Sequence, residues 1–317
     1  MSVLIPTKDR AADLALTIES VLGQTTLPDE LLIVDQSRDE AAESRTRARW
    51  ALGTPARLVY VRRPELSGLA AARNCAMDRA CGEIWLFLDD DVVLEPDFLA
   101  QLLAAYRAHP EATGISGVVT NYVRPGWADW AWTVVFARGP FHDQRQAIYW
   151  NAGRLRAEPP RRVRRLGGGL MSFRAAALRG LRFDEQLSGV CDGEDVDFCA
   201  RLGSAAVLLI APGARLAHYR SPAGREPIHW LRRQARSETS LYLRNWGRPG
   251  WRGWAHRLCF GWLQAGFALA ASLAAVRRCS ASPWRAWRQG VADARRIIPR
   301  RVADAAPGPA EWDRAGR

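Results

Sequence analysis

Four short runs of apolar residues, each closed by polar residues, set the strongest constraint on what this chain can fold into. The runs lie at 3–5, 31–34, 59–61 and 85–88, and segments of helix length separate them. Strands that are apolar throughout are buried on both faces, and helical connections between them are typical of parallel pairing. We therefore expect an α/β fold with a mainly parallel central sheet. Later apolar runs at 170–173 and 207–210 predict further strands.

Polar side chains follow these expected strands at the points where they end. Thr7 and Asp9 follow the first strand, Asp35 the second, and three consecutive aspartates, Asp89, Asp90 and Asp91, the fourth. Open α/β sheets bind ligands at the carboxyl ends of their strands. Three adjacent carboxylates repel one another unless a cation neutralises them, and Mg²⁺ or Mn²⁺ suits carboxylate and phosphate oxygens. The pattern predicts such a metal site, with a solvated acidic turn as the alternative interpretation.

In combination, these motifs resemble family 2 of the glycosyltransferases. The resemblance lies in residues 3–10, 31–37, 68–96 and 183–202, and it covers about the first 220 residues. It implies a nucleotide-sugar-binding, Rossmann-like fold of the GT-A type. It also implies metal-assisted, inverting transfer of a hexosyl or deoxyhexosyl group from a nucleotide sugar to a glycan or a lipid-linked saccharide.

The resemblance further implies a donor site at the strand ends and at one helix start. Asp35 would hydrogen-bond the base, although Gln36 stands where the family usually has a second aspartate, so the base preference stays open. Arg73 would lie near the donor nucleotide, and a surface arginine on an alanine-rich helix is the alternative. The residues assigned to nucleotide-sugar binding are Pro6, Thr7, Asp9, Asp35, Arg73, Asn74, Asp89 and Asp90.

The metal ligands and the general base come from the same resemblance. Asp91 would bind the metal directly, with Asp89 as its partner and His218 closing the site, unless that histidine is structural. Within Gly-Glu-Asp-Val-Asp-Phe, Asp195 is the first choice and Glu194 the second for the base that takes the proton from the acceptor hydroxyl. Both acids could instead stabilise a helix N-terminus.

The middle of the chain gives a weaker signal. Residues 121–165 hold tryptophans among glycine, proline and arginine, and they are expected to be irregular, as a loop region over the site. Gly167, Gly168 and Gly169 would let an acceptor approach the backbone, or would form a hinge. The expected organisation has three parts: a nucleotide-sugar-binding half at 1–120, an acceptor-binding half at 121–225 and a helical, membrane-associating tail at 226–317.

The positive charge lies almost entirely in that tail. The net charge is +12, but residues 1–219 carry 26 basic and 27 acidic side chains, whereas residues 220–317 carry 19 and 6. The tail also holds eight of the fourteen tryptophans and a mostly apolar run at 258–276. This run is near the roughly 20 residues that span a bilayer, while its flanking arginines and tryptophans fit a helix lying on anionic head groups. Packing on the catalytic part is the third interpretation.

These observations predict a cytoplasmic protein held peripherally on the inner face of the cell membrane, with a single-pass anchor as the alternative. Six cysteines without a pairing pattern predict reduced thiols. No nucleic-acid partner is expected, because the body is neutral and lacks an RNA-binding signature. Two other function classes stay open. A sugar nucleotidyltransferase would release pyrophosphate, and a non-catalytic membrane- or nucleic-acid-binding protein would bind through the tail in a salt-sensitive way.

Overall fold

The computed structural model describes residues 1–50, 53, 56–187, 193–219, 227–247 and 250–297. The strands are β1 (Ser2–Thr7), β2 (Glu30–Asp35), β3 (Arg57–Arg62), β4 (Ile84–Leu88), β5 (Val92–Leu94), β6 (Gly114–Val119), β7 (Arg161–Val163), β8 (Leu170–Arg174) and β9 (Leu208–His218). The α-helices are α1 (Ala11–Leu22), α2 (Ala41–Trp50), α3 (Leu69–Met77), α4 (Phe98–Ala108), α5 (Trp127–Phe136), α6 (Gln144–Trp150), α7 (Glu194–Arg201), α8 (Pro227–Leu241), α9 (Trp251–Arg278) and α10 (Ser282–Ile297). Short 3₁₀ turns lie at Gly139–Phe141, Ala175–Leu178 and Glu185–Leu187, and a π-helical turn, Tyr242–Trp246, follows α8.

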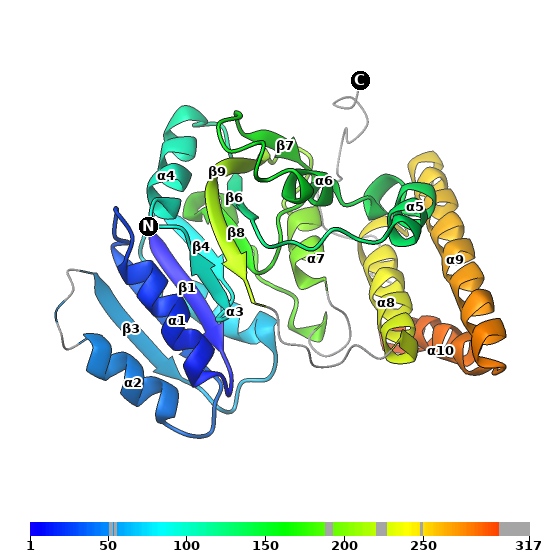
Figure 1. The fold of residues 1–317 in the computed structure, drawn as a ribbon, viewed down its shortest axis with the longest axis horizontal. Coiled ribbons are helices and arrows are strands. Elements are labelled where there is room, and N and C mark those ends of the chain that lie inside the picture. Colours follow the sequence, from blue (N-terminus) through cyan, green and yellow to red (C-terminus); the bar gives the residue numbers. More distant parts are fainter. Residues whose placement is uncertain (51–52, 54–55, 188–192, 220–226, 248–249, 298–317) are drawn as a thin grey trace.

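One nine-stranded sheet is built from strands between Ser2 and His218, the part of the molecule that precedes the tail. The strand order is β3-β2-β1-β4-β8-β6-β9-β5, with β7 pairing β9 (Figure 1). Strands β1 to β4 pair in parallel, as expected, and every residue of β1 and β2 is buried. Beyond β4 the sheet is mixed, because β8 runs antiparallel to both β4 and β6. The pairing of β4 with β8 joins the two expected halves of the catalytic part in one sheet, and the boundary near residue 120 stays a prediction.

Strand β6 is part of the core that the sequence pattern did not reveal. Its two glycines interrupt the apolar run, yet all six residues are buried. A Cβ at Gly117 would lie 2.3 Å from the Ala214 carbonyl oxygen, and one at Gly114 would lie 2.6 Å from the Phe173 ring. Close packing against the neighbouring strands therefore requires glycine here, and the same glycines remove the apolar signal.

The expectation of an irregular loop region at 121–165 is wrong. This segment forms α5, α6 and β7, and α5 leaves the sheet to pack beside α9 of the tail (Figure 1). Trp132 and Phe136 on α5 contact aromatic rings of α9, and the Trp132 indole donates a hydrogen bond to the Gly266 carbonyl at 3.2 Å. Trp132, which the sequence pattern placed in a loop, is thus a contact between helices.

The tail consists of α8, α9 and α10, which lie together beside the sheet (Figure 1). Helix α10 packs closely on α8, since a Cβ at Gly290 would lie 2.3 Å from the Arg232 carbonyl oxygen. The core of this bundle is formed by Phe141, Leu231, Tyr242, Leu263, Phe267 and Ala271. Cysteines in the described ranges form no disulfide with one another, and Cys191 lies outside those ranges, as does Trp312 of the tail.

Candidate active site

The candidate site lies where the strand order of the parallel half reverses. The chain proceeds outward from β1 to β2 and β3 and then returns to place β4 on the other side of β1. Ligands of doubly wound sheets bind at such a switch point, outside the carboxyl ends of the strands. Thr7 ends β1, and Asp89 to Asp91 follow β4. The Thr7 hydroxyl donates to an Asp90 carboxylate oxygen at 2.6 Å, so the two strand ends are linked directly.

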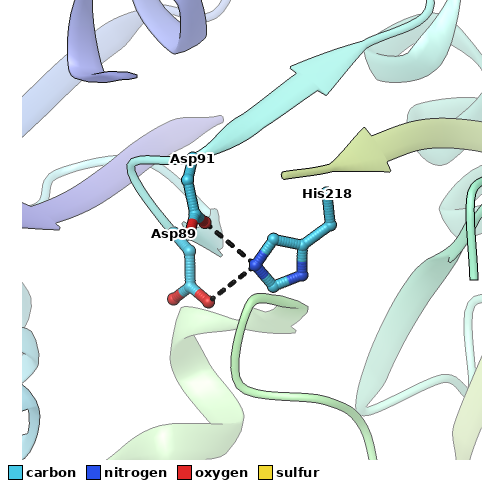
Figure 2. Close-up of side chains that lie close together, drawn as sticks. All are labelled: Asp89, Asp91 and His218. Atoms are coloured by element: carbon cyan, nitrogen blue, oxygen red, sulfur yellow. Dashed lines mark ion pairs between the residues drawn. The ribbon is translucent and has the colours of Figure 1, made fainter. Parts of the chain in front are cut away.

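Asp89, Asp91 and His218 form a compact group of potential metal ligands (Figure 2). One ligand atom from each residue lies within 4.8 Å of the others. His218 is the last residue of β9, and β9 pairs with β5 directly after the aspartates, which brings the imidazole to them. His218 Nε2 lies 2.9 Å from Asp91 Oδ1 and 3.7 Å from Asp89 Oδ2. Two carboxylates and one imidazole suit a cation such as Mn²⁺.

Two further observations agree with a cation at this group. Asp91 Oδ1 is buried and accepts no hydrogen bond of good geometry, so a buried charged atom lacks a full set of partners. Gly169 also lies against the group, because a Cβ there would be 2.5 Å from Asp89 Oδ2 and 3.2 Å from His218 Cε1. Because Gly169 has no side chain, the Asp89 carboxylate can lie directly against the backbone, and the residues present fit a divalent metal ion.

Arg10 compensates part of the negative charge of the aspartates. Its guanidinium lies 3.2 Å from Asp90 Oδ1 and 3.1 Å from Asp91 Oδ2. Burial raises the pKa of Asp90, although Thr7 and Arg10 oppose that shift. Burial acts on Asp91 in the same direction, but His218 and Arg10 outweigh it and lower the pKa of Asp91. Arg10 is a site residue that sequence reasoning missed, even though it follows Asp9 directly at the end of β1.

Arg73 lies between the metal-ligand group and Glu194 of α7. Only 1% of the residue is exposed, so it is not the surface arginine of the alternative interpretation. Its Nη1 donates to Glu194 Oε1 at 2.8 Å, and its Nη2 donates to the Gly168 carbonyl at 2.6 Å and lies 3.4 Å from Asp89 Oδ1. A buried guanidinium with three such partners fixes their relative positions.

Asp195 lies on the other side of the glycine segment from the metal-ligand group. Its Oδ2 accepts a hydrogen bond from the Gly168 amide at 2.8 Å, and the next glycine contacts Asp89. Arg145 Nη1 lies 3.5 Å from the same oxygen. Neighbouring Glu194 pairs with Arg73 instead, and burial raises its pKa despite that arginine. Gly167 to Gly169 thus separate a candidate base from a candidate metal site.

A second group of charged residues contacts Asp195 through Arg145, and the sequence pattern did not identify this group. Arg145 on α6 binds both oxygens of Asp143 at 2.9 Å, and Arg165 lies 3.5 Å from the same carboxylate. Burial alone would raise the pKa of Asp143, but the two arginines reverse this and hold it well below its ordinary value. Arg145 is fifty positions from Asp195 in the sequence and lies in the stretch that was expected to be irregular. No sequence motif therefore linked the two residues.

The remaining donor-site residues have more varied surroundings. Asp35 is buried and accepts hydrogen bonds from the Tyr60 hydroxyl at 2.7 Å and the Ser37 amide at 2.8 Å. Pro6 is buried inside β1, and Asp9 takes a left-handed conformation (φ 55°) in the turn after it. The Asn74 side chain binds the segment before α7: its amide forms hydrogen bonds with the Phe183 backbone at 2.8 and 2.9 Å and with Glu185 at 2.8 Å. Its contacts position this segment, which leads toward α7.

Comparison with known proteins supports a common family for the catalytic part. Residues 2–177, more than half of the chain, match the family model described as glycosyl transferase family 2. The succinoglycan biosynthesis protein ExoM of Rhizobium meliloti (strain 1021) is 29% identical over 179 residues, which cover 56% of this chain and 52% of that protein. A glucosyl-dolichyl phosphate glucuronosyltransferase of Haloferax volcanii is 31% identical over 111 residues, covering 35% of this chain and 33% of the relative. The chain spans about half the length, or less, of these curated relatives.

Solved structures share the fold over nearly the whole chain. S. aureus TarS 1-349 in complex with UDP-GlcNAc is 16% identical and superposes with a TM-score of 0.59, covering 94% of this chain and 81% of that one. The mannosyltransferase PcManGT from Pyrobaculum calidifontis, in complex with GDP-Man and Mn²⁺, is 20% identical with a TM-score of 0.56, covering 92% and 84%. The expected α/β fold of the GT-A type, with a helical C-terminal tail, is confirmed.

Proposed function

The chain belongs to glycosyl transferase family 2, and from that premise we propose that it transfers a sugar from a nucleotide-sugar donor to a saccharide, with inversion at the anomeric carbon. The observation that carries this proposal is the grouping of Asp89, Asp91 and His218 at the switch point, one glycine segment away from Asp195. Nucleotide sugars bound to structurally similar proteins support the donor class.

In the proposed reaction, Asp195 accepts the proton of the acceptor hydroxyl as its oxygen attacks the anomeric carbon. The bond between that carbon and the phosphate oxygen breaks, and its electron pair leaves with the nucleoside diphosphate. Asp89, Asp91 and His218 would hold Mg²⁺ or Mn²⁺, which would stabilise the charge of the departing diphosphate when bound. Arg73 holds Glu194 of α7 in register with Asp89 through its contacts with both carboxylates.

The acceptor is proposed to be a growing glycan or a lipid-linked saccharide at the cytoplasmic face of the membrane. The relative named as a succinoglycan biosynthesis protein supports a polysaccharide product, and the other relative's name includes a dolichyl phosphate. Helix α9 supports the location, because residues Gly253–Arg278 are long and apolar enough to cross a bilayer by length and composition. The flanking arginines add attraction to anionic lipids.

Turnover of a donor panel tests this proposal. The protein is incubated with UDP-, GDP- and dTDP-sugars, Mn²⁺ and candidate saccharide acceptors, and the released nucleotide is identified. We expect a nucleoside diphosphate from at least one donor, together with a product whose anomeric configuration, measured by NMR, is opposite to that of the donor. In a parallel incubation with a nucleoside triphosphate and a sugar 1-phosphate, release of pyrophosphate together with formation of a nucleotide sugar would indicate a nucleotidyltransferase. Retention of configuration in the donor panel would contradict a single displacement assisted by Asp195.

A further inference from the structure

Helix α9 carries apolar side chains on two opposite sides. At 3.6 residues per turn, one buried stripe consists of Leu263, Phe267 and Ala271, which pack into the core of the tail. The other stripe is exposed to solvent and falls within an arc of about 100° on the same helix. Its members are Trp254, Leu258, Trp262, Leu269, Leu273 and Val276, with exposed fractions from 47% to 77%. A helix of a soluble bundle needs only the first stripe.

Helix α5 has the same two-sided character. Trp132 and Phe136 face α9, while Trp127, Trp130 and Val134 are exposed, Trp127 by 83%. No residue of α5 is buried. Apart from its contacts with α9, helix α5 is exposed to solvent. Large contiguous apolar patches of this kind mark sites of contact with another molecule or with lipid.

Trp262 joins the exposed stripe of α9 to helix α5. It belongs to the exposed stripe of α9, yet its indole donates a hydrogen bond to the Val135 carbonyl of α5 at 2.8 Å, and its ring lies 5.4 Å from that of Phe136. Gly266 allows this close approach, since a Cβ there would lie 2.5 Å from the Phe136 ring. The exposed apolar side chains of α5 and α9 therefore belong to two helices that pack against each other, and we call them together the α5–α9 face.

We propose that the α5–α9 face lies flat in the head-group region of an anionic lipid bilayer. This inference rests on the proposed membrane location and deepens it by naming the surface and its orientation. The stripe on α9 extends over ~33 Å parallel to the helix axis, a shape that fits the plane of an interface. The opposite stripe is held in the protein core, so α9 lies on the membrane and does not cross it.

Charge identifies an anionic lipid surface as the occupant. Helix α9 contains no acidic residue between Gly253 and Arg278. Exposed arginines lie beside the apolar stripe at Arg257 and at its end at Arg277 and Arg278, and Arg138 is exposed just after α5. Tryptophan and arginine around an apolar stripe are the residue types that bind at the boundary between acyl chains and anionic head groups.

Flotation with vesicles tests the proposal without any sugar present, so it is independent of catalysis. The full chain is mixed with vesicles of phosphatidylcholine containing ~30% phosphatidylglycerol, a composition that supplies the anionic charge. We expect the protein to float with these vesicles, to bind pure phosphatidylcholine at least about tenfold more weakly, and to be released by alkaline carbonate, as an interfacial protein is. Retention after carbonate treatment would show a spanning helix and overturn the flat orientation.

Variants of each helix test whether both contribute. The triple change Leu258→Gln, Leu269→Gln and Leu273→Gln alters α9, and the pair Trp127→Ser and Trp130→Ser alters α5. Each set is expected to weaken vesicle binding about tenfold or more, while donor turnover with a soluble acceptor persists. Leu16→Gln, at a leucine on α1 that is 61% exposed, is the matched control and should bind like the unmodified chain.

The outcomes separate this inference from the proposed function. Loss of vesicle binding only in the α9 set would overturn the two-helix face. If the protein binds none of the vesicles and instead forms a dimer that the same substitutions dissociate, a second copy of the chain covers the face and the lipid proposal is overturned. Unchanged melting temperatures in the variants would confirm that the substituted side chains act on the surface and not on folding. Intact vesicle binding by a chain without donor turnover would contradict only the proposed enzyme activity.

Discussion

Folded proteins usually bury apolar side chains and expose charged ones. Two regions of this molecule depart from that rule in opposite ways: the sheet edge at Asp89–Asp91, and the α5–α9 face. At the sheet edge, charged groups such as Arg73 and Asp91 are buried, with 1% and 8% exposure. On the α5–α9 face, apolar groups such as Trp127 and Val276 are exposed by 83% and 77%. Buried charges and exposed apolar patches are the informative exceptions in a folded protein. We propose a partner for each region: a cation and a phosphate for the first, and a lipid surface for the second.

A physical connection runs between the two regions. Arg145 binds Asp195 on one side and Asp143 on the other, and Asp143 also pairs with Arg165. Glu238 on α8 interacts with Arg165, and Asn245 in the π-helical turn donates a hydrogen bond to Asp197 of α7 at 3.0 Å. The tail is thus tied to the helix that carries the proposed base, although we propose a different role, membrane binding, for its exposed surface.

The largest expected effect is at the buried charges. Asp91→Asn removes a negative charge from the metal-ligand group, so donor turnover in Mn²⁺ should fall by about 10³-fold, because a catalytic cation contributes several kcal/mol. Vesicle binding should not change, which would sharpen the separation of the two regions. Asp97→Asn, at the N-cap of α4, is the matched control and should keep its activity. Equal turnover by the Asp91→Asn variant and the unmodified chain would contradict the proposed metal site.

The next effect distinguishes the two acids of α7. Asp195→Asn should reduce sugar transfer by about 10²-fold, because the base is lost, while donor binding measured by calorimetry persists. Glu194→Gln should reduce transfer less, since that side chain acts through its ion pair with Arg73. A larger loss in Glu194→Gln than in Asp195→Asn would reverse the assignment and make Glu194 the base.

Gly169→Ala should weaken metal-dependent nucleotide binding by about 10-fold, a loss typical when the supports of a metal site are disturbed. The added methyl group would lie 2.5 Å from Asp89 Oδ2, so the carboxylate must move. Gly153→Ala is the control, because a Cβ there meets no atom within 4 Å. Equal Mn²⁺ affinity in both variants, measured by titration calorimetry, would show that the close approach of Gly169 to Asp89 has no role.

The smallest expected effect concerns the connection to the tail. Burial raises the pKa of Glu238 to about 7, against the opposing charge of Arg165. The folded state therefore binds this proton more tightly than the unfolded state, and the resulting stability is lost as the pH rises from about 4.5 through 7. Glu238→Gln cannot ionise, so its melting temperature should exceed that of the unmodified chain by a few degrees at pH 8 and should match it at pH 4. An identical pH dependence in both proteins would contradict this role of Glu238.

The sequence predicted the part of the fold in which each strand is continuously apolar. Residues 31–34 and 85–88 lie in β2 and β4, and the polar residues that follow them lie at the site. The pattern failed at β6, where Gly114 and Gly117 are needed for packing and interrupt the apolar run. It also failed at α5, because tryptophans that pack on a distant helix have no partner visible in the local sequence.

For the site, strand-end residues were predictable and long-range supports were not. Asp89, Asp91 and His218 were expected together from the family resemblance, and the fold brings them together. Arg145 and Asp143 carry no motif, and their position behind Asp195 follows only from the packing of α6 against the sheet. Asn74 matches a donor-site element, and its side chain forms hydrogen bonds with residues 183 and 185; its role in donor binding stays a prediction.

The most direct measurement of the proposed donor and metal site is the melting temperature with nucleoside diphosphates, with and without Mn²⁺. A ligand that binds only the folded state raises its stability, by about 2.7 kcal/mol at a hundred times the dissociation constant. We predict that UDP, GDP or dTDP stabilises the chain in Mn²⁺, and that EDTA or Asp91→Asn abolishes the shift. Equal stabilisation of both chains in EDTA, or none by any nucleotide, would contradict a metal-assisted donor site at the end of β4.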